Sequence, residues 1–203
     1  MRAQCARTKV TPSSGSAREQ LLLARAETPD AVVKIPIRVE PADETAPTVE
    51  YRWDPDTEIL SAQVSSKGAS KGMSGSVEVE GADGSWLIFD IASGRINGVE
   101  VAVWPDVQKR NSLAPPAKVE DASIRVPSRG SQPGIASVEV ETAVSAEADE
   151  AERVFHFRIG KSKGVRTVRY ARDLLLELDG SSHLSGLWFL NVPPFPATPA
   201  AIA

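Results

Sequence analysis

The sequence predicts a mainly β protein with two pseudo-twofold-related antiparallel repeats, packed as one sandwich- or barrel-like body with flexible termini. Two observations support this prediction. Apolar and polar residues alternate in short segments between Asp30 and Val192, and Gly, Pro or Asp residues separate the segments. Such alternation is typical of strands joined by tight turns. The second half of the chain also resembles the first, and no amphipathic helical stretch of useful length interrupts either half.

The chain starts with residues 1–29, in which five Arg or Lys residues outnumber two Glu residues. We expect a disordered basic tail here. The segment AREQLLLARA (17–26) contains good helix formers and could form a short helix, although a helix of this length is marginal alone. Its leucines could also dock in a groove of another protein, and the composition is compatible with a targeting segment.

The strands of the first repeat are expected within residues 30–107, in VVKIPIRVE, TVEYRW, ILSAQV, SVEVE, WLIFDI and INGVEVAVW. Residues 108–120 contain two adjacent prolines and no periodicity, which is typical of a linker. The second repeat follows within residues 121–196, in ASIRVP, IASVEVETAV, VFHFRI, VRTVRYA, LLLEL and LSGLWFLNV. Residues 197–203 form a second disordered tail.

The two repeats match in order along the chain, with offsets of 87 to 95 residues. The matched pairs are DAVVKIPIR with DASIRVPSR, VEY with VEV, ILSAQV with VFHFRI, SVEVE with TVRYA, LIFDI with LLLEL, and INGVEVAV with LSGLWFLN. The last pair aligns Gly98 with Gly186, and a glycine inside a strand suggests a bulge or a close backbone approach. A unit of about 75 residues is near the lower limit of stability, so we expect two units to share one core.

One set of residues in the first repeat matches the motif of a known family: Trp53, Asp54, Pro55, Asp56, Val77, Glu78, Gly94, Arg95, Gly98, Val99 and Glu100. In these residues the first repeat resembles a bacterial family of small domains of unknown function, the YuzE-like proteins. The second repeat follows the same outline with Asp179, Gly180 and Gly186, but it lacks the Asp-Pro start. The resemblance implies a fused pair of family units, without catalytic residues or a cofactor, and a regulatory or antitoxin-like role.

Composition excludes several classes of protein. The chain of 203 residues has a formal net charge of −4, so we expect no electrostatic binding to nucleic acid. No apolar run approaches the roughly 20 residues that a membrane-spanning helix needs. One cysteine, Cys5, and two histidines provide neither an internal disulfide nor a usual zinc site. We therefore expect a cytoplasmic protein without a metal or another cofactor, and the oligomeric state stays open.

Two sets of residues are candidates for a site. The first is a partner-binding set of basic residues with one tryptophan, which could contact an acidic group or another protein: Lys161, Lys163, Arg166, Arg169 and Trp188. The second is a set of polar residues that could converge at the seam between the repeats, with His156 as a general base: His156, Arg158 and Glu100.

Three hypotheses about function follow. The first is a non-enzymatic β module that binds another protein. The second is a small-ligand-binding protein or an enzyme with its site at the seam. In the third, the second repeat serves only to complete the first. We expect most of the four tryptophans to anchor the core, and an exposed one would mark a binding patch: Trp53, Trp86, Trp104 and Trp188.

Overall fold

The computed structural model describes residues 34–42, 47–65, 73–128 and 135–196. These ranges form fourteen strands in two sheets, and they contain no helix. The predicted all-β class is therefore confirmed, and no described helix could cross a membrane. The predicted tails, 1–29 with its short helix and 197–203, lie outside the described residues.

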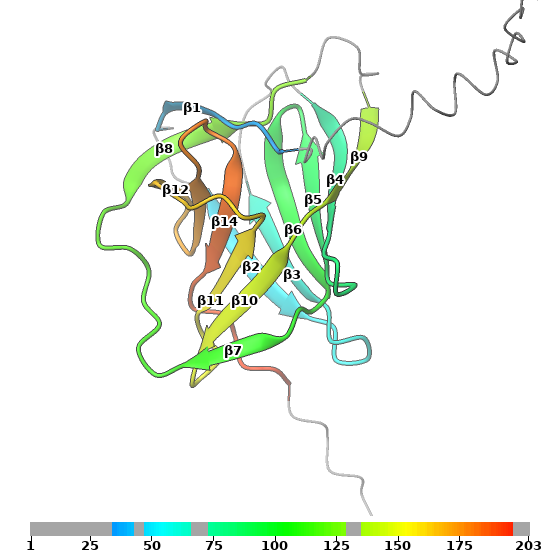
Figure 1. Ribbon diagram of the computed structural model, residues 1–203, viewed down its shortest axis with the longest axis vertical. Coiled ribbons are helices and arrows are strands. Elements are labelled where there is room, and N and C mark those ends of the chain that lie inside the picture. Colours follow the sequence, from blue (N-terminus) through cyan, green and yellow to red (C-terminus); the bar gives the residue numbers. More distant parts are fainter. Residues whose placement is uncertain (1–33, 43–46, 66–72, 129–134, 197–203) are drawn as a thin grey trace, which may run out of the picture. The chain divides into compact units, whose positions relative to one another are not determined.

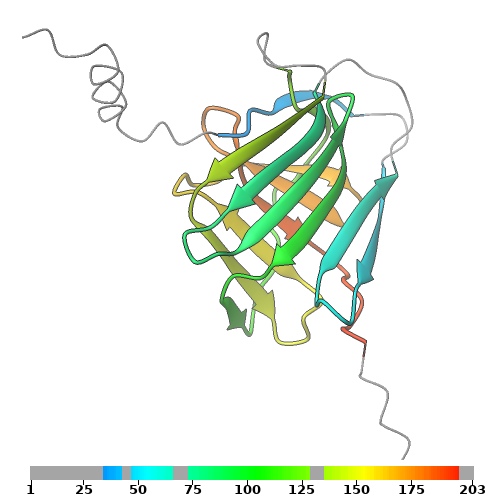
Figure 2. The same cartoon turned by 90° about the vertical axis from the view of Figure 1, so that its right-hand side faces the viewer.

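One sheet has six strands, and it faces the viewer in Figure 2 with the other sheet behind it. Its strand order is β2-β3-β6-β5-β4-β9. Neighbouring strands pair antiparallel, except for β4 and β9, which pair parallel. The strands, in spatial order, are β2 (Thr48–Trp53), β3 (Leu60–Ser65), β6 (Arg95–Val103), β5 (Trp86–Ala92), β4 (Ser74–Glu80) and β9 (Ile135–Glu141).

The other sheet has eight strands in the order β1-β8-β12-β13-β14-β11-β10-β7. In Figure 1 its strands β8, β12, β14, β11 and β10 are labelled in the left half of the view. The strands, in spatial order, are β1 (Arg38–Pro41), β8 (Glu120–Arg125), β12 (Arg166–Ala171), β13 (Leu174–Leu178), β14 (Leu184–Phe189), β11 (Phe155–Ile159), β10 (Val144–Asp149) and β7 (Val107–Arg110).

The core lies between the two sheets, as expected for a sandwich. Each strand sends alternate side chains inward because successive residues of a strand point to opposite faces. The six-stranded sheet contributes Leu60, Phe89 and Val101, and each is at most 1% exposed. The eight-stranded sheet contributes Phe157 and Phe189, which are fully buried. One hydrophobic cluster therefore joins residues from both predicted repeats.

Segments outside the ladders close the ends of the sandwich. The Ile37 N–H donates to the Ser182 carbonyl at 2.9 Å, and the Leu184 N–H donates to the Ile35 carbonyl at 2.9 Å. These bonds hold the segment before β1 against the β13–β14 turn. The Val126 N–H donates to the Gly94 carbonyl at 2.8 Å, which joins the end of β8 to the six-stranded sheet.

Five strands of each sheet lie in a corresponding spatial order. The order β2-β3-β6-β5-β4 in one sheet corresponds to β10-β11-β14-β13-β12 in the other. The first hairpin of each set closes alike, because the Asp54 N–H donates to the Ile59 carbonyl at 2.9 Å and the Asp149 N–H to the Val154 carbonyl at 3.0 Å. The predicted pseudo-twofold axis between the halves stays a prediction.

Three details differ from the sequence prediction. The sheets are mixed, because β7, β8 and β9 each pair parallel with a strand distant in sequence. These strands come from the part of the chain that crosses between the sheets, so hairpin geometry does not dictate their direction. Most of the predicted linker, 108–120, is irregular, but its start belongs to β7, where pairing with β10 overrides weak local propensity. The strand order matches β2 with β10, whereas sequence alternation matched it with the segment of β9.

The connection between β7 and β8 follows the side of the eight-stranded sheet that faces away from the six-stranded sheet (Figure 1). Four of its residues, Leu113, Pro115, Pro116 and Val119, are partly buried. On this outer side of the sheet, Leu175 is 1% exposed and Trp188 is 4% exposed. The β7–β8 connection therefore runs on the side of the sheet to which these two buried residues point.

Candidate functional site

The outer face of the eight-stranded sheet carries a closed polar cluster around His156. Phe155 and Phe157 point into the core, so His156 points outward by strand alternation. Its ring stacks on Trp188 with centroids 4.0 Å apart and an angle of 9° between the planes. Although it points outward, His156 is only 4% exposed.

Two carboxylates flank the imidazole. His156 Nε2 lies 3.2 Å from Glu177 Oε2, and His156 Nδ1 lies 3.7 Å from Glu147 Oε2. The Trp188 indole N–H donates to Glu177 Oε1 at 2.8 Å, and the Arg110 guanidinium lies 2.9 Å from Glu147. The cluster thus links β7, β10, β11, β13 and β14 in one polar network.

Two glycines make room for the Glu177 side chain. A Cβ at Gly186 would lie 2.7 Å from the Phe157 carbonyl oxygen and 3.0 Å from Glu177 Oε2. A Cβ at Gly164 would lie 2.8 Å from the same Glu177 oxygen. The β11–β12 connection therefore packs directly on this carboxylate.

Burial by itself raises the pKa of Glu177, but other effects outweigh it. Hydrogen bonds with His156 and Trp188, together with the nearby His156 imidazole and Arg158 guanidinium, stabilise the carboxylate, so its pKa lies below the ordinary value. Glu177 is an ionised acceptor that orients His156 and Trp188. An imidazole held between carboxylates is a familiar catalytic element, but here the enclosure favours a structural role.

The structure separates the predicted partner-binding set. Arg166 makes a two-pronged contact with Glu120, with Nε–O and Nη–O distances of 2.8 and 2.5 Å, and Arg169 Nε lies 3.1 Å from Asp121. Trp188 is buried. Lys161 and Lys163 are exposed on the β11–β12 connection. These residues therefore do not form one exposed basic patch with an aromatic centre.

The predicted seam set does not converge either. Val99 and Val101 are fully buried in the core, so Glu100 between them points away from it on the six-stranded sheet. His156 and Arg158 point away from the core on the eight-stranded sheet. The hydrophobic core lies between these groups. Among the described residues, no group of His, Cys, Asp or Glu side chains could hold a metal ion.

The outer face of the six-stranded sheet, called here the open face, has a different character. Trp86 is 38% exposed, and its cross-strand neighbour Val103 is 45% exposed. Arg52 is the one exposed basic side chain described on these strands, and it lies 3.5 Å from Glu50. Seven carboxylates share this face with the apolar pair: Glu50, Glu78, Glu80, Asp90, Glu100, Glu139 and Glu141.

Sequence reasoning missed the open face because alternation does not show which positions become neighbours. The signal was present in SVEVE and WLIFDI, where Glu78, Glu80, Trp86 and Asp90 occupy the polar positions. Their assembly depends on the register, which places Glu80 opposite Trp86 and Glu78 opposite Ile88.

Comparison with known proteins adds no relative. No protein-family model matches the chain, and no curated protein is similar to it. The resemblance to the YuzE-like family stays a prediction.

Proposed function

We propose that this chain is a non-enzymatic β module that binds another protein through its open face. One observation carries the proposal: the two outer faces of the sandwich differ in exposure. On the eight-stranded sheet, the outward-pointing Leu175 and Trp188 are at most 4% exposed, whereas the open face leaves Trp86 at 38% and Val103 at 45%. Large exposed apolar side chains with a polar surround are typical of interaction sites.

The composition of the open face suits a protein interface. Aromatic side chains are enriched at the centres of interfaces, and polar groups form their rims. Trp86 supplies the aromatic centre, and Glu80, Ile88 and Val103 are its cross-strand or same-face neighbours. The carboxylates give this face a negative potential, which favours and steers a partner of opposite charge.

A regulatory or antitoxin-like role in the cytoplasm is the finer proposal, and it rests on the family resemblance. The alternative, a ligand or catalytic site at the seam, has less support because His156 and Glu100 point to opposite outer sides of the sandwich. The closed contacts around Glu177 also leave little access to the histidine.

Site-specific photo-crosslinking tests the proposal. A photoreactive phenylalanine analogue at Ile88 would lie at the centre of the open face, and one at exposed Arg158 would report on the opposite face. We expect an adduct with one host protein from position 88, and reconstitution of that complex from purified proteins. An adduct formed only from position 158 would contradict the proposal.

Two alanine variants make the test quantitative. Trp86 and Phe195 are each 38% exposed, but only Trp86 belongs to the open face. We expect Trp86→Ala to weaken the reconstituted complex at least tenfold, as an interface anchor does, and Phe195→Ala to leave it unchanged. Equal effects of the two variants would rule out the open face as the binding surface.

A further inference from the structure

We propose that the partner binds as an extended segment that adds a strand beside β9, with basic and small apolar side chains in alternation. This inference rests on the proposed function, because β9 is one of the two edge strands of the sheet that carries the open face. It names the kind of segment that the partner must supply. Three features of β9 support it: its backbone, its outward side chains and its inward side chains.

Within the described part of the chain, one backbone edge of β9 has no neighbouring strand. Among the described strands, β9 pairs only with β4, in parallel register over all seven of its residues. The Thr142 N–H donates to the Glu80 carbonyl at 2.9 Å, so alternation directs the N–H groups of Glu141, Glu139 and Ser137 away from β4. Such an edge is a template for another strand, and strand addition is a common mode of peptide recognition.

The outward side chains of β9 call for positive charge. Glu139 lies directly opposite Glu78, and Glu141 lies directly opposite Glu80. Like charges in directly opposed positions destabilise a sheet, so this arrangement contradicts a local rule of strand pairing. Lys or Arg side chains on a neighbouring strand would relieve the repulsion. Because the described residues include no set of ligands for a metal ion, a peptide cation is the better counterpart.

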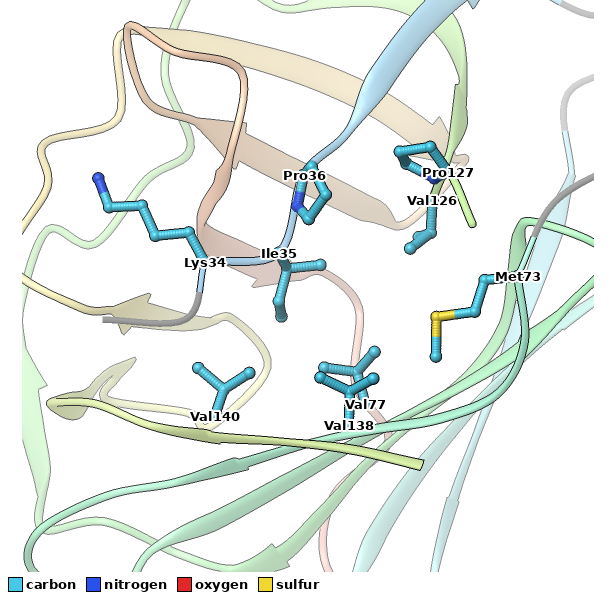
Figure 3. A pocket seen from close by; sticks show the side chains of 9 residues that line it. All are labelled: Lys34, Ile35, Pro36, Met73, Val77, Val126, Pro127, Val138 and Val140. Atoms are coloured by element: carbon cyan, nitrogen blue, oxygen red, sulfur yellow. The ribbon is translucent and has the colours of Figure 1, made fainter. Parts of the chain in front are cut away.

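The inward side chains of β9 border an apolar pocket. Figure 3 shows Val138 and Val140 on one side and Ile35 on the other, with Met73 and Val77 beside them. The cavity is about 20 Å³, enough for one group the size of a methyl or a water molecule. Inward side chains of an added strand would lie next to Val138 and Val140, so the pocket selects Ala or Val over an aromatic residue.

A second copy of this chain is the less suitable occupant. Pairing of two β9 strands edge to edge would bring Glu139 and Glu141 of one copy beside those of the other. That contact would add like-charge pairs to the ones already present across β4 and β9. The acidic edge therefore acts against self-association and for a basic partner.

A labelled seven-residue peptide of alternating Lys and Val tests the inference on the full chain, because β9 has seven residues. Fluorescence anisotropy should show binding, and a peptide of the same composition with Lys and Val in separate blocks should bind at least tenfold more weakly. Neighbouring residues of a strand direct their N–H groups to opposite edges. N-methylation of one alternate set should therefore abolish binding, and N-methylation of the other set should not.

Charge variants of the protein provide a second arm. Glu139→Gln combined with Glu141→Gln should weaken peptide binding about three- to tenfold, the range expected for two exposed ion pairs. The matched control is Glu50→Gln combined with Glu100→Gln, which removes the same charge from the open face away from β9. The inference would be overturned if both double variants lost the same peptide affinity, or if the two N-methylated peptides bound equally. It would also be overturned if the protein formed a dimer that competes with the peptide.

The two proposals can fail separately. If a host protein crosslinks at position 88 but the alternating peptide does not bind, strand addition is rejected and the open face is kept as the binding surface. Peptide binding beside β9, together with a host complex insensitive to Trp86→Ala, would keep strand addition and reject the open face.

Discussion

The two sheets carry the same hairpin glycine in different surroundings. Gly98 lies between Gln63 and Asp90 on the six-stranded sheet, and Gly186 lies between Arg158 and Glu177 on the eight-stranded sheet. In both, the register shifts immediately after the acidic residue. The acidic residue Asp90 of the first site is exposed, whereas Glu177 of the second lies under the β11–β12 connection. Strand order and register alone therefore do not determine whether an outer face is available to a partner.

The largest expected difference concerns the two outward tryptophans. Trp188→Ala removes a buried ring that stacks on His156, so we expect a loss of about 3–5 kcal/mol in the free energy of unfolding. Trp86 is 38% exposed, and Trp86→Ala should cost less than about 1 kcal/mol. Urea denaturation of the two variants measures both values. Similar losses would show that the two outer faces do not differ in packing.

The glycine pair gives the next largest effect. Gly186→Ala places a Cβ 2.7 Å from a backbone carbonyl oxygen, and we expect a loss of about 2–3 kcal/mol from overpacking. A Cβ added at Gly98 by Gly98→Ala would lie 3.3 Å from its nearest atom, Gln63 Nε2. That atom ends a flexible, exposed side chain, so we expect a change within about 0.5 kcal/mol. Thermal or urea denaturation would contradict the comparison if Gly98→Ala were the more damaging change.

The acidic residues beside these glycines should differ as well. Glu177→Gln weakens the interaction with His156 and leaves Trp188 with a neutral acceptor, and we expect a loss of about 1–3 kcal/mol. Asp90→Asn changes an exposed side chain and should alter stability by less than about 0.5 kcal/mol. Trp fluorescence during urea denaturation reports both variants. A neutral effect of Glu177→Gln would mean that the cluster does not stabilise the cover over this face.

The smallest expected effect is the pH dependence of the stability that the Glu177 carboxylate contributes. The pKa of Glu177 is lowered in the folded protein, so its carboxylate stabilises the fold above the unfolded pKa of about 4.3. This contribution is lost as the pH falls through the lowered folded value. The stability difference between wild type and Glu177→Gln should therefore shrink below about pH 4. If the stability difference between the two proteins grew on acidification, the pKa of Glu177 would be raised in the folded protein and not lowered.

Much of the fold could be predicted from local pattern. The alternation of Val77, Glu78 and Val79 predicts a half-buried strand, and the turn after Ala92 predicts a hairpin. Most strands of both halves follow from this pattern, but β7 (Val107–Arg110) and β10 (Val144–Asp149) are not predicted, because their local alternation is weak or absent. The parallel strands were harder to predict, because β9 pairs with β4 across more than fifty residues of chain, and no local signal specifies such a partner.

The candidate site could be predicted only in part. Polar positions at Glu78, Glu80 and Asp90 follow from alternation, but the prediction placed the binding residues at Arg166, Arg169 and Trp188. Those two arginines instead pair with acidic residues of β8, and the tryptophan is buried against His156. Their partners lie far away in sequence or on a different strand, so composition could not reveal the pairing.

Local alternation is enough to specify the β class, the positions of most strands and turns, and the side of each strand that faces the core, because strand side chains alternate with a period of two. Tertiary structure decided which outer face is covered and which is open. Alternation assigns a residue to the outside of its own sheet, but burial there depends on segments that arrive from elsewhere in the chain. The β7–β8 connection lies on the outer side of one sheet, and the acidic, tryptophan-bearing surface of the other remains exposed.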